Sequence, residues 1–244
     1  MKKIITILSI IILTGCNLDI SNTPTKKVEE FLNKYQILDE EILSELDDVI
    51  DKKTKLNMTR QRIVVKVGSN VLTRSDGKLD VTRMSALVDQ IASLRQQGTE
   101  VILVSSGAMA SGRGELRVDH SLDSVEQRQL FSAVGQVKLV GLYYDLFREF
   151  GIHVGQVLTM KENFQPGEQY RNQQACMKVM LENGVIPIVN ENDTVSVTEL
   201  MFTDNDELSG LIAQMMQADT LILLSNIDGI YTGNPADPQS QLIS

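Results

Sequence analysis

Residues 62–70 read RIVVKVGSN, an apolar run of β-branched residues that ends in a glycine and two small polar residues. Valine and isoleucine favour strands, and a nearly continuous apolar run is typical of a strand that is buried on both faces of a parallel sheet. A glycine directly after such a strand allows the backbone to turn tightly or to approach a ligand closely. This stretch therefore predicts a buried strand with a candidate binding loop at its carboxyl end.

The same alternation continues to residue 225. We expect further strands at 100–105, 152–158, 185–190 and 219–225, and helices at 80–97, 107–114, 123–149, 168–183 and 205–217. Strands that alternate with helices imply βαβ units with right-handed crossovers. The predicted fold class is therefore α/β, with an open, mostly parallel sheet flanked by helices.

Polar residues follow several of these strands. They are Ser105-Ser106-Gly107, then 190–193 (NEND), then Ser225-Asn226, and a further cluster at 203–206 (TDND) precedes the last helix. Each cluster alone is compatible with a turn or a helix cap. In open parallel sheets, however, ligands bind outside the carboxyl ends of the strands. The recurrence of polar clusters after successive strands therefore favours a ligand site along this edge.

Composition excludes several other classes. The net charge of −9 argues against non-specific nucleic-acid binding, which needs a basic surface. The two cysteines cannot form a disulfide framework. No Gly-x4-Gly-Lys-[Ser/Thr] phosphate loop occurs, and His120 and His153 lack the neighbours that a zinc or nucleophile–base site requires.

The first 57 residues have a different character. Two lysines precede an apolar run from Ile4 to Leu13, which ends in Leu13-Thr14-Gly15-Cys16. This order resembles a bacterial lipoprotein signal at residues 1–16, with Cys16 as the lipidated residue. Residues 17–57 read as a polar tether and an acidic amphipathic helix, a short helical appendage to which we assign no chemistry. At Met58 the character changes again, as if two reading frames were joined there.

Residues 61–244 resemble the amino-acid kinase fold and, within it, the glutamate 5-kinases. The matching segments are 64–73 (VVKVGSNVLT), 104–108 (VSSGA), 133–136 (AVGQ), 151–156 (GIHVGQ), 187–193 (PIVNEND), 204–209 (DNDELS) and 228–232 (DGIYT). Acetylglutamate, aspartate, uridylate and carbamate kinases share the fold. The pairing of 190–193 with 204–206 is what points to glutamate 5-kinase, with residues 58–244 as the kinase domain.

The resemblance also implies roles for individual residues. Lys66 contacts ATP and the transferring phosphoryl group, and Asp206 orients the catalytic lysines. The nucleotide also meets Gly68, Ser69, Ser225 and Asn226, although the family often has Thr-Asp at the last two positions. The glutamate substrate is held by Ser106, Asp193 and Asn205. On charge grounds Asp193 should bind the substrate's ammonium group. Mg²⁺ would be held mainly by the phosphates of ATP, with no metal ligand from the protein.

The implied activity is ATP-dependent phosphorylation of the side-chain carboxylate of L-glutamate, the first step of proline biosynthesis. A carboxylate is already ionised at neutral pH, so the reaction needs positioning and charge neutralisation and no general base. The resemblance further implies a homo-oligomer in the cytoplasm, with proline as feedback inhibitor.

The chain also departs from the family, because the Gly-Gly-Met-x-Thr-Lys stretch, which carries a second catalytic lysine, is missing before Ser244. We therefore expect a domain that is incomplete at its carboxyl end, with little activity and an uncovered apolar edge at 219–225. Two alternatives stay open. One is an exported, membrane-anchored lipoprotein with an inactive kinase-like module, which lipidation of Cys16 would favour. The other is an amino-acid kinase with a different acceptor.

Overall fold

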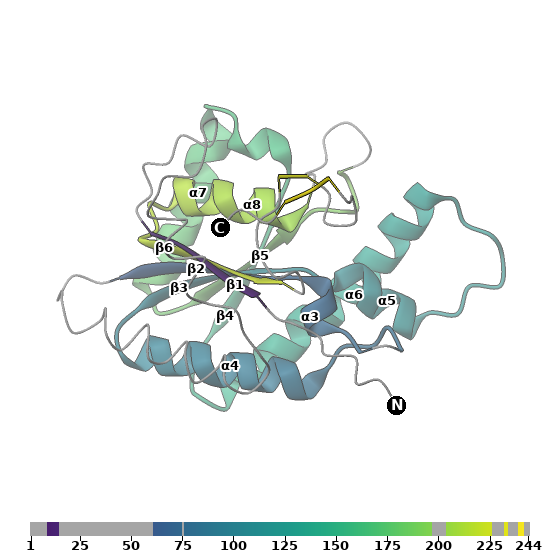
Figure 1. Cartoon of the computed structure of the whole chain (residues 1–244), viewed down its shortest axis with the longest axis horizontal. Coiled ribbons are helices and arrows are strands. Elements are labelled where there is room, and N and C mark those ends of the chain that lie inside the picture. The colour runs from purple at the N-terminus through teal and green to yellow at the C-terminus, as the bar shows by residue number, and fades with distance from the viewer. Residues whose placement is uncertain are drawn as a thin grey trace.

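The computed structural model describes residues 9–14, as backbone, and residues 61–74, 76–196, 204–225, 232–233 and 239–241. Five parallel strands form the centre of the molecule in the order β6-β2-β3-β5-β4 (Figure 1). Their bounds are β2 Arg62–Val67, β3 Glu100–Ser105, β4 Val154–Thr159, β5 Ile186–Glu191 and β6 Thr220–Ser225. The predicted α/β class and the five predicted strands are confirmed.

Helices cover both faces of this sheet, as Figure 1 shows. One face carries α4 (Val81–Gln96) and α6 (Ser124–Arg148), and the other carries α7 (Glu168–Glu182) and α8 (Asn205–Met215). Shorter elements are α3 (Ser69–Leu72), α5 (Ala108–Glu115) and the 3-10 turn η1 (Lys161–Phe164). No helix in the described ranges is long and apolar enough to cross a membrane.

Alternate residues of each central strand enter two different cores. In β2, Ile63, Val65 and Val67 pack on the α4 and α6 side, whereas Val64 packs on the α7 and α8 side. All four side chains are almost completely buried. This explains the unbroken apolar run in the sequence, because a strand between two helical layers has no face that water can reach.

Two glycines bring α5 and α6 into backbone contact. A Cβ atom at Gly135 would lie 1.7 Å from the carbonyl oxygen of Ala108, and one at Gly112 would lie 1.9 Å from that of Phe131. Any side chain at either position would therefore force the two helices apart. Helix α5 begins directly after Gly107, whose φ of +104° favours glycine. The position of the loop after β3 therefore depends on the packing of α5 against α6.

The free edge of β6 is paired with a sixth strand, β1 (Ser9–Thr14). It runs antiparallel to β6, with Ser9 opposite Ser225 and Thr14 opposite Thr220. The expectation of an uncovered edge at 219–225 is therefore wrong, because a segment from the apolar run of the leader lies along it. The rest of the predicted signal, including Cys16, and the predicted helix within 17–57 lie outside the described residues.

Candidate active site

The carboxyl ends of β2, β3 and β5 meet the first turn of α8, and most of the predicted site residues lie there. Lys66, the penultimate residue of β2, is only 6% exposed. Its Nζ atom lies 2.6 Å from Oδ1 of Asp206, the second residue of α8. Burial of a lysine is costly unless an anion compensates its charge. The structure thus brings together the two residues for which the family resemblance implies catalytic roles, at the carboxyl edge of the sheet.

Gly68 leaves room beside this lysine. A Cβ atom at position 68 would lie 3.4 Å from Lys66 Nζ and 3.5 Å from the carbonyl oxygen of Leu224. The backbone amide of Gly68 donates to that same carbonyl at 3.1 Å. This amide therefore holds the loop to β6.

The other residues predicted for the nucleotide are only partly described. Ser69 is exposed at the start of α3, next to Gly68. Ser225 is the last residue of β6 and is half-buried. Asn226 lies outside the described residues.

A chain of side-chain hydrogen bonds joins three segments that are distant in sequence. Asn205 Nδ2 donates to Ser106 Oγ at 2.7 Å and to Asn190 Oδ1 at 3.1 Å. Asn190 Nδ2 in turn donates to Gln136 Oε1 at 3.0 Å. Ser106 and Asn205, both predicted substrate residues, are thus in direct contact, and Asn190 and Gln136 support them from β5 and α6. Sequence reasoning quoted the segments of Asn190 and Gln136 but gave neither residue a role.

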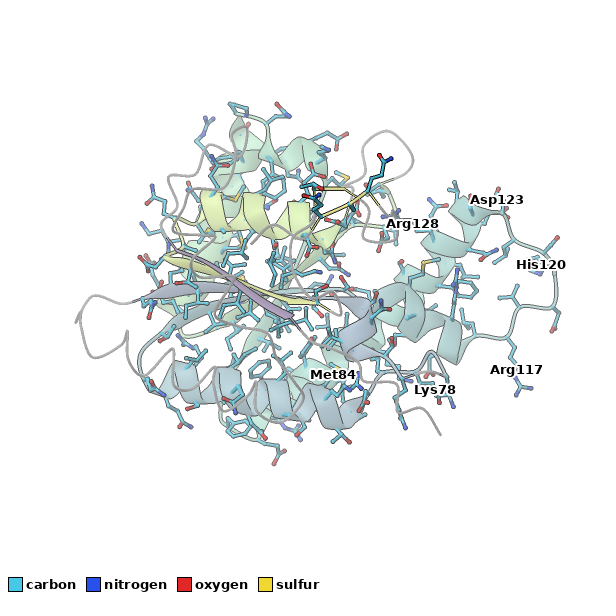
Figure 2. All side chains as sticks on the ribbon, in the orientation of Figure 1. Lys78, Met84, Arg117, His120, Asp123 and Arg128 are labelled. Atoms are coloured by element: carbon cyan, nitrogen blue, oxygen red, sulfur yellow. The ribbon has the colours of Figure 1, made fainter. Side chains whose placement is uncertain are left out.

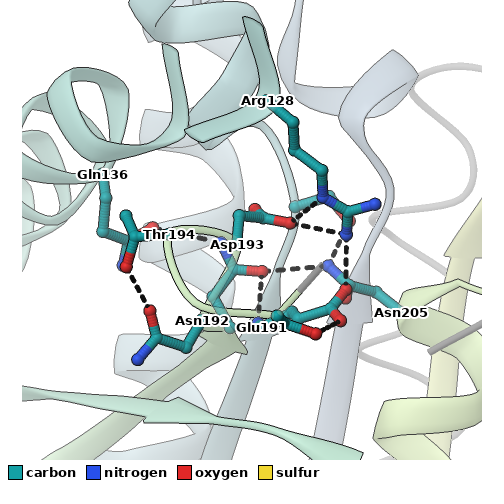
Figure 3. A network of polar contacts seen from close by, with 10 residues as sticks. Arg128, Gln136, Glu191, Asn192, Asp193, Thr194 and Asn205 are labelled. Carbon is teal, nitrogen blue, oxygen red and sulfur yellow. Dashed lines mark hydrogen bonds and ion pairs between the residues drawn. The ribbon is translucent and has the colours of Figure 1, made fainter. Parts of the chain in front are cut away.

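The third predicted substrate residue, Asp193, belongs to an acidic cluster held by Arg128 (Figure 3). Arg128 Nε donates to Asp193 Oδ1 at 2.7 Å, and Arg128 Nη2 donates to Glu191 Oε2 at 2.8 Å. Ser196 Oγ also donates to Glu191 Oε1 at 2.7 Å. Sequence reasoning missed Arg128. The available signal was a cation near the amino end of a helix, where the helix dipole disfavours positive charge unless an anion is close.

A buried tyrosine lies behind the strand end that carries Ser106. The Tyr143 hydroxyl of α6 lies 3.0 Å from Ser105 Oγ, which also contacts the carbonyl oxygen of Ser106 at 3.1 Å. Burial raises the pKa of Tyr143 well above its usual value, and the hydrogen bond with Ser105 offsets part of that rise. The phenol therefore stays neutral and supports the β3 end as a hydrogen-bonding group.

The two histidines lie apart from this site. Figure 2 shows His120 on the loop between α5 and α6, together with Arg117 and Asp123 and away from the sheet. His153 is exposed just before β4. Among the residues that the structure describes, no three His, Cys, Asp or Glu side chains are grouped so that they could hold a metal ion.

The described fold is a parallel α/β sheet with a buried lysine, paired with Asp206, at its carboxyl edge. The amino acid kinase family model matches residues 61–244, and the chain belongs to this family. The fold is also similar to that in "X-ray structures of isopentenyl phosphate kinase", with a TM-score of 0.50 at 19% identity, covering 75% of this chain and 79% of that one.

Curated relatives narrow the comparison further. The chain is 72% identical over 182 residues to the glutamate 5-kinase of Bacteroides thetaiotaomicron. The matched region covers 75% of this chain and 51% of that protein. It is 50% identical over 179 residues to the glutamate 5-kinase of Chlorobaculum tepidum, with coverage of 72% and 50%. The chain thus spans about half the length of these relatives. The family predicted from the sequence motifs is confirmed.

Proposed function

We propose that residues 58–244 form the kinase domain of a glutamate 5-kinase, which uses ATP to convert L-glutamate to glutamyl 5-phosphate at the start of proline biosynthesis. The observation that carries the proposal is the 72% identity over 182 residues to a protein of that name. The direct contact between Ser106 and Asn205, with Asp193 on the neighbouring loop, supports it from the side of the site.

In the proposed reaction a side-chain carboxylate oxygen of L-glutamate attacks the terminal phosphorus of ATP. The new P–O bond forms while the bond to ADP breaks, and the electron pair leaves with ADP. Lys66 would neutralise charge on the transferred group, and its ion pair with Asp206 would hold the ammonium in place. No group has to remove a proton, since the attacking oxygen is already ionised.

The amino-acid end of the substrate would rest on the other side of the site. Asp193 is the residue whose charge suits the substrate ammonium. Ser106 and Asn205 offer a hydroxyl and an amide, which can hydrogen-bond a carboxylate. Asn205 is hydrogen-bonded to Asn190, and Asn190 to Gln136 in a buried contact. These hydrogen bonds favour a fixed arrangement of the groups, because a buried amide that loses its partner is costly.

Mg²⁺ would be held mainly by ATP itself and would neutralise part of the charge on its phosphates. In this proposal the phosphates supply its ligands, with Lys66 beside them. The same proposal includes a cytoplasmic location, a homo-oligomer and feedback inhibition by proline, as the resemblance to glutamate 5-kinases implies.

The test measures both turnover and binding with the purified chain. Mg-ATP and hydroxylamine are added with L-glutamate, L-aspartate or N-acetyl-L-glutamate, so that any acyl phosphate is trapped as a hydroxamate. Calorimetry of the three amino acids gives their affinities independently of turnover. We expect L-glutamate to bind most tightly and, within the little turnover expected of this chain, to be the preferred acceptor. Tighter binding of either alternative, or no binding of L-glutamate, would refute the substrate assignment.

A further inference from the structure

Arg128 lies between two carboxylates of the β5 end. Its Nη2 atom is 2.6 Å from Asp193 Oδ1 and 2.8 Å from Glu191 Oε2. The side chains of Glu191 and Asp193 are 6% and 16% exposed, so water screens neither charge well. Two carboxylates this close and this dry repel each other unless a cation compensates them. Arg128 provides that compensation with two charged hydrogen bonds, a geometry that suits guanidinium better than ammonium.

The loop after β5, which carries Asp193, is attached to α6 at a second point. Gln129, the residue after Arg128, donates from Nε2 to the carbonyl oxygen of Thr194 at 2.8 Å. Consecutive residues of α6 therefore hold consecutive residues of the loop, one through a side-chain carboxylate and one through the backbone. The loop conformation has this backbone anchor besides Arg128, whereas the orientation of the Asp193 carboxylate depends on the guanidinium.

Both contacts from Arg128 to Asp193 fall on Oδ1. Two donors on one oxygen restrict rotation of the carboxylate without using Oδ2. Under the proposed function, on which this inference rests, Asp193 receives the ammonium group of L-glutamate. A carboxylate that is held from one side by an arginine presents its other oxygen at a fixed position, and binding then costs less conformational entropy.

We propose that Arg128 is the positioning residue of the amino-acid subsite, which holds the Asp193 carboxylate in the orientation that receives the substrate's ammonium group. It acts through Asp193 and sets the affinity for L-glutamate. The nucleotide side, built around Lys66 and Asp206 on β2 and α8, does not depend on it.

The first experiment is calorimetry of L-glutamate with the purified 244-residue chain and three variants. We expect Arg128→Gln to weaken the binding of L-glutamate about tenfold or more, since it removes the charged contacts with both carboxylates. Arg128→Lys should fall between Arg128→Gln and wild type, because an ammonium group keeps the charge but cannot reproduce the fork. Arg113→Gln is the matched control. Arg113 is an exposed arginine on α5 that lies over the Phe131 ring, and its loss should leave the affinity unchanged.

The second experiment is a double-mutant cycle with Asp193→Asn. If Arg128 acts through Asp193, Arg128→Gln in the Asp193→Asn background should change the dissociation constant by no more than about twofold. Thermal unfolding of each variant checks the fold, and Arg128→Lys answers the question if Arg128→Gln does not fold.

The outcomes separate this inference from the function on which it rests. Wild-type chain that does not bind L-glutamate would remove the proposed function and the inference with it. Wild-type binding together with unchanged or tighter binding by Arg128→Gln would overturn the positioning role alone. The positioning role would also be overturned if the fold-losses in L-glutamate affinity of the two single variants multiplied in the double variant, because Arg128 would then act independently of Asp193.

Discussion

The contact between α5 and α6 should make Gly135→Ala one of the most damaging single-atom additions in this protein. The added Cβ would lie 1.7 Å from the Ala108 carbonyl oxygen, and real Cβ atoms essentially never approach closer than 3.0 Å. The helices must therefore separate by at least the difference, 3.0 − 1.7 = 1.3 Å. Because the obstructing atoms are backbone, no side-chain rotation can relieve the clash.

The expected cost lies at the upper end of the range for overpacking, about 3 kcal/mol. For a domain of this size that lowers the midpoint of thermal unfolding by about 6–12 °C. The substitution should also weaken the binding of L-glutamate. Helix α5 begins directly after Ser106 and Gly107, so a shift of α5 would move these two residues. Circular dichroism on heating and calorimetry with L-glutamate measure the two effects.

Gly141→Ala is the matched control, because it makes the same change on the same helix. No atom lies within 4 Å of a Cβ at position 141, which is exposed. Alanine is favoured over glycine inside a helix by up to about 1 kcal/mol, so this variant should unfold about 2–4 °C higher than wild type. If Gly135→Ala unfolded within about 1 °C of wild type, the close packing of α5 on α6 would be wrong.

Three further substitutions test separate parts of the site. Lys66→Met keeps the buried hydrocarbon but removes the charge. In a version of the protein that carries the family's Gly-Gly-Met-x-Thr-Lys stretch, trapping of the acyl phosphate should fall about a hundredfold or more while the fold is retained. Wild-type turnover would contradict the role of this lysine. Asp193→Asn should weaken the binding of L-glutamate, measured by calorimetry, and leave the affinity for Mg-ATP unchanged. An equal loss of affinity for both ligands would contradict a separate amino-acid subsite. Tyr143→Phe should reduce the loss of stability that the wild-type protein shows above about pH 10. Because the pKa of Tyr143 is raised in the folded state, the phenol ionises first in the unfolded state, and the free energy of unfolding of the wild type falls as pH rises. Denaturant titrations of both proteins at pH 8 to 11 measure the difference.

The sequence predicted the elements of the sheet closely because their signals are local. The predicted strand at 100–105 coincides with β3, and the predicted helix at 123–149 exceeds α6 by one residue at each end. Apolar runs between helical layers and helical periodicity are properties of the segment itself. The Asp123 cap at the start of α6 is equally local, since its side chain accepts from the amides of Val125 and Glu126.

The features that sequence reasoning missed depend on pairs of distant residues. Arg128 is defined by carboxylates 63 and 65 positions further along the chain. The contact of Gly135 with Ala108 requires a particular crossing of two helices, which no pattern within either helix specifies. The pairing of β1 with β6 joins segments from opposite ends of the chain. The ion pair of Lys66 with Asp206 also joins residues that are distant in sequence, and only the resemblance to a known family linked those two residues in advance.

Helix α6 explains why the two sides of the site should respond separately to mutation. Its residues Arg128 and Gln136 contact the β5 end, and Tyr143 contacts the β3 end. The lysine side depends on other elements, since Lys66 lies on β2 and Asp206 on α8. A change that shifts α6 should therefore alter amino-acid affinity before it alters the environment of Lys66. Selection for a different acceptor could act through α6 while the groups that neutralise the transferred phosphate stay in place.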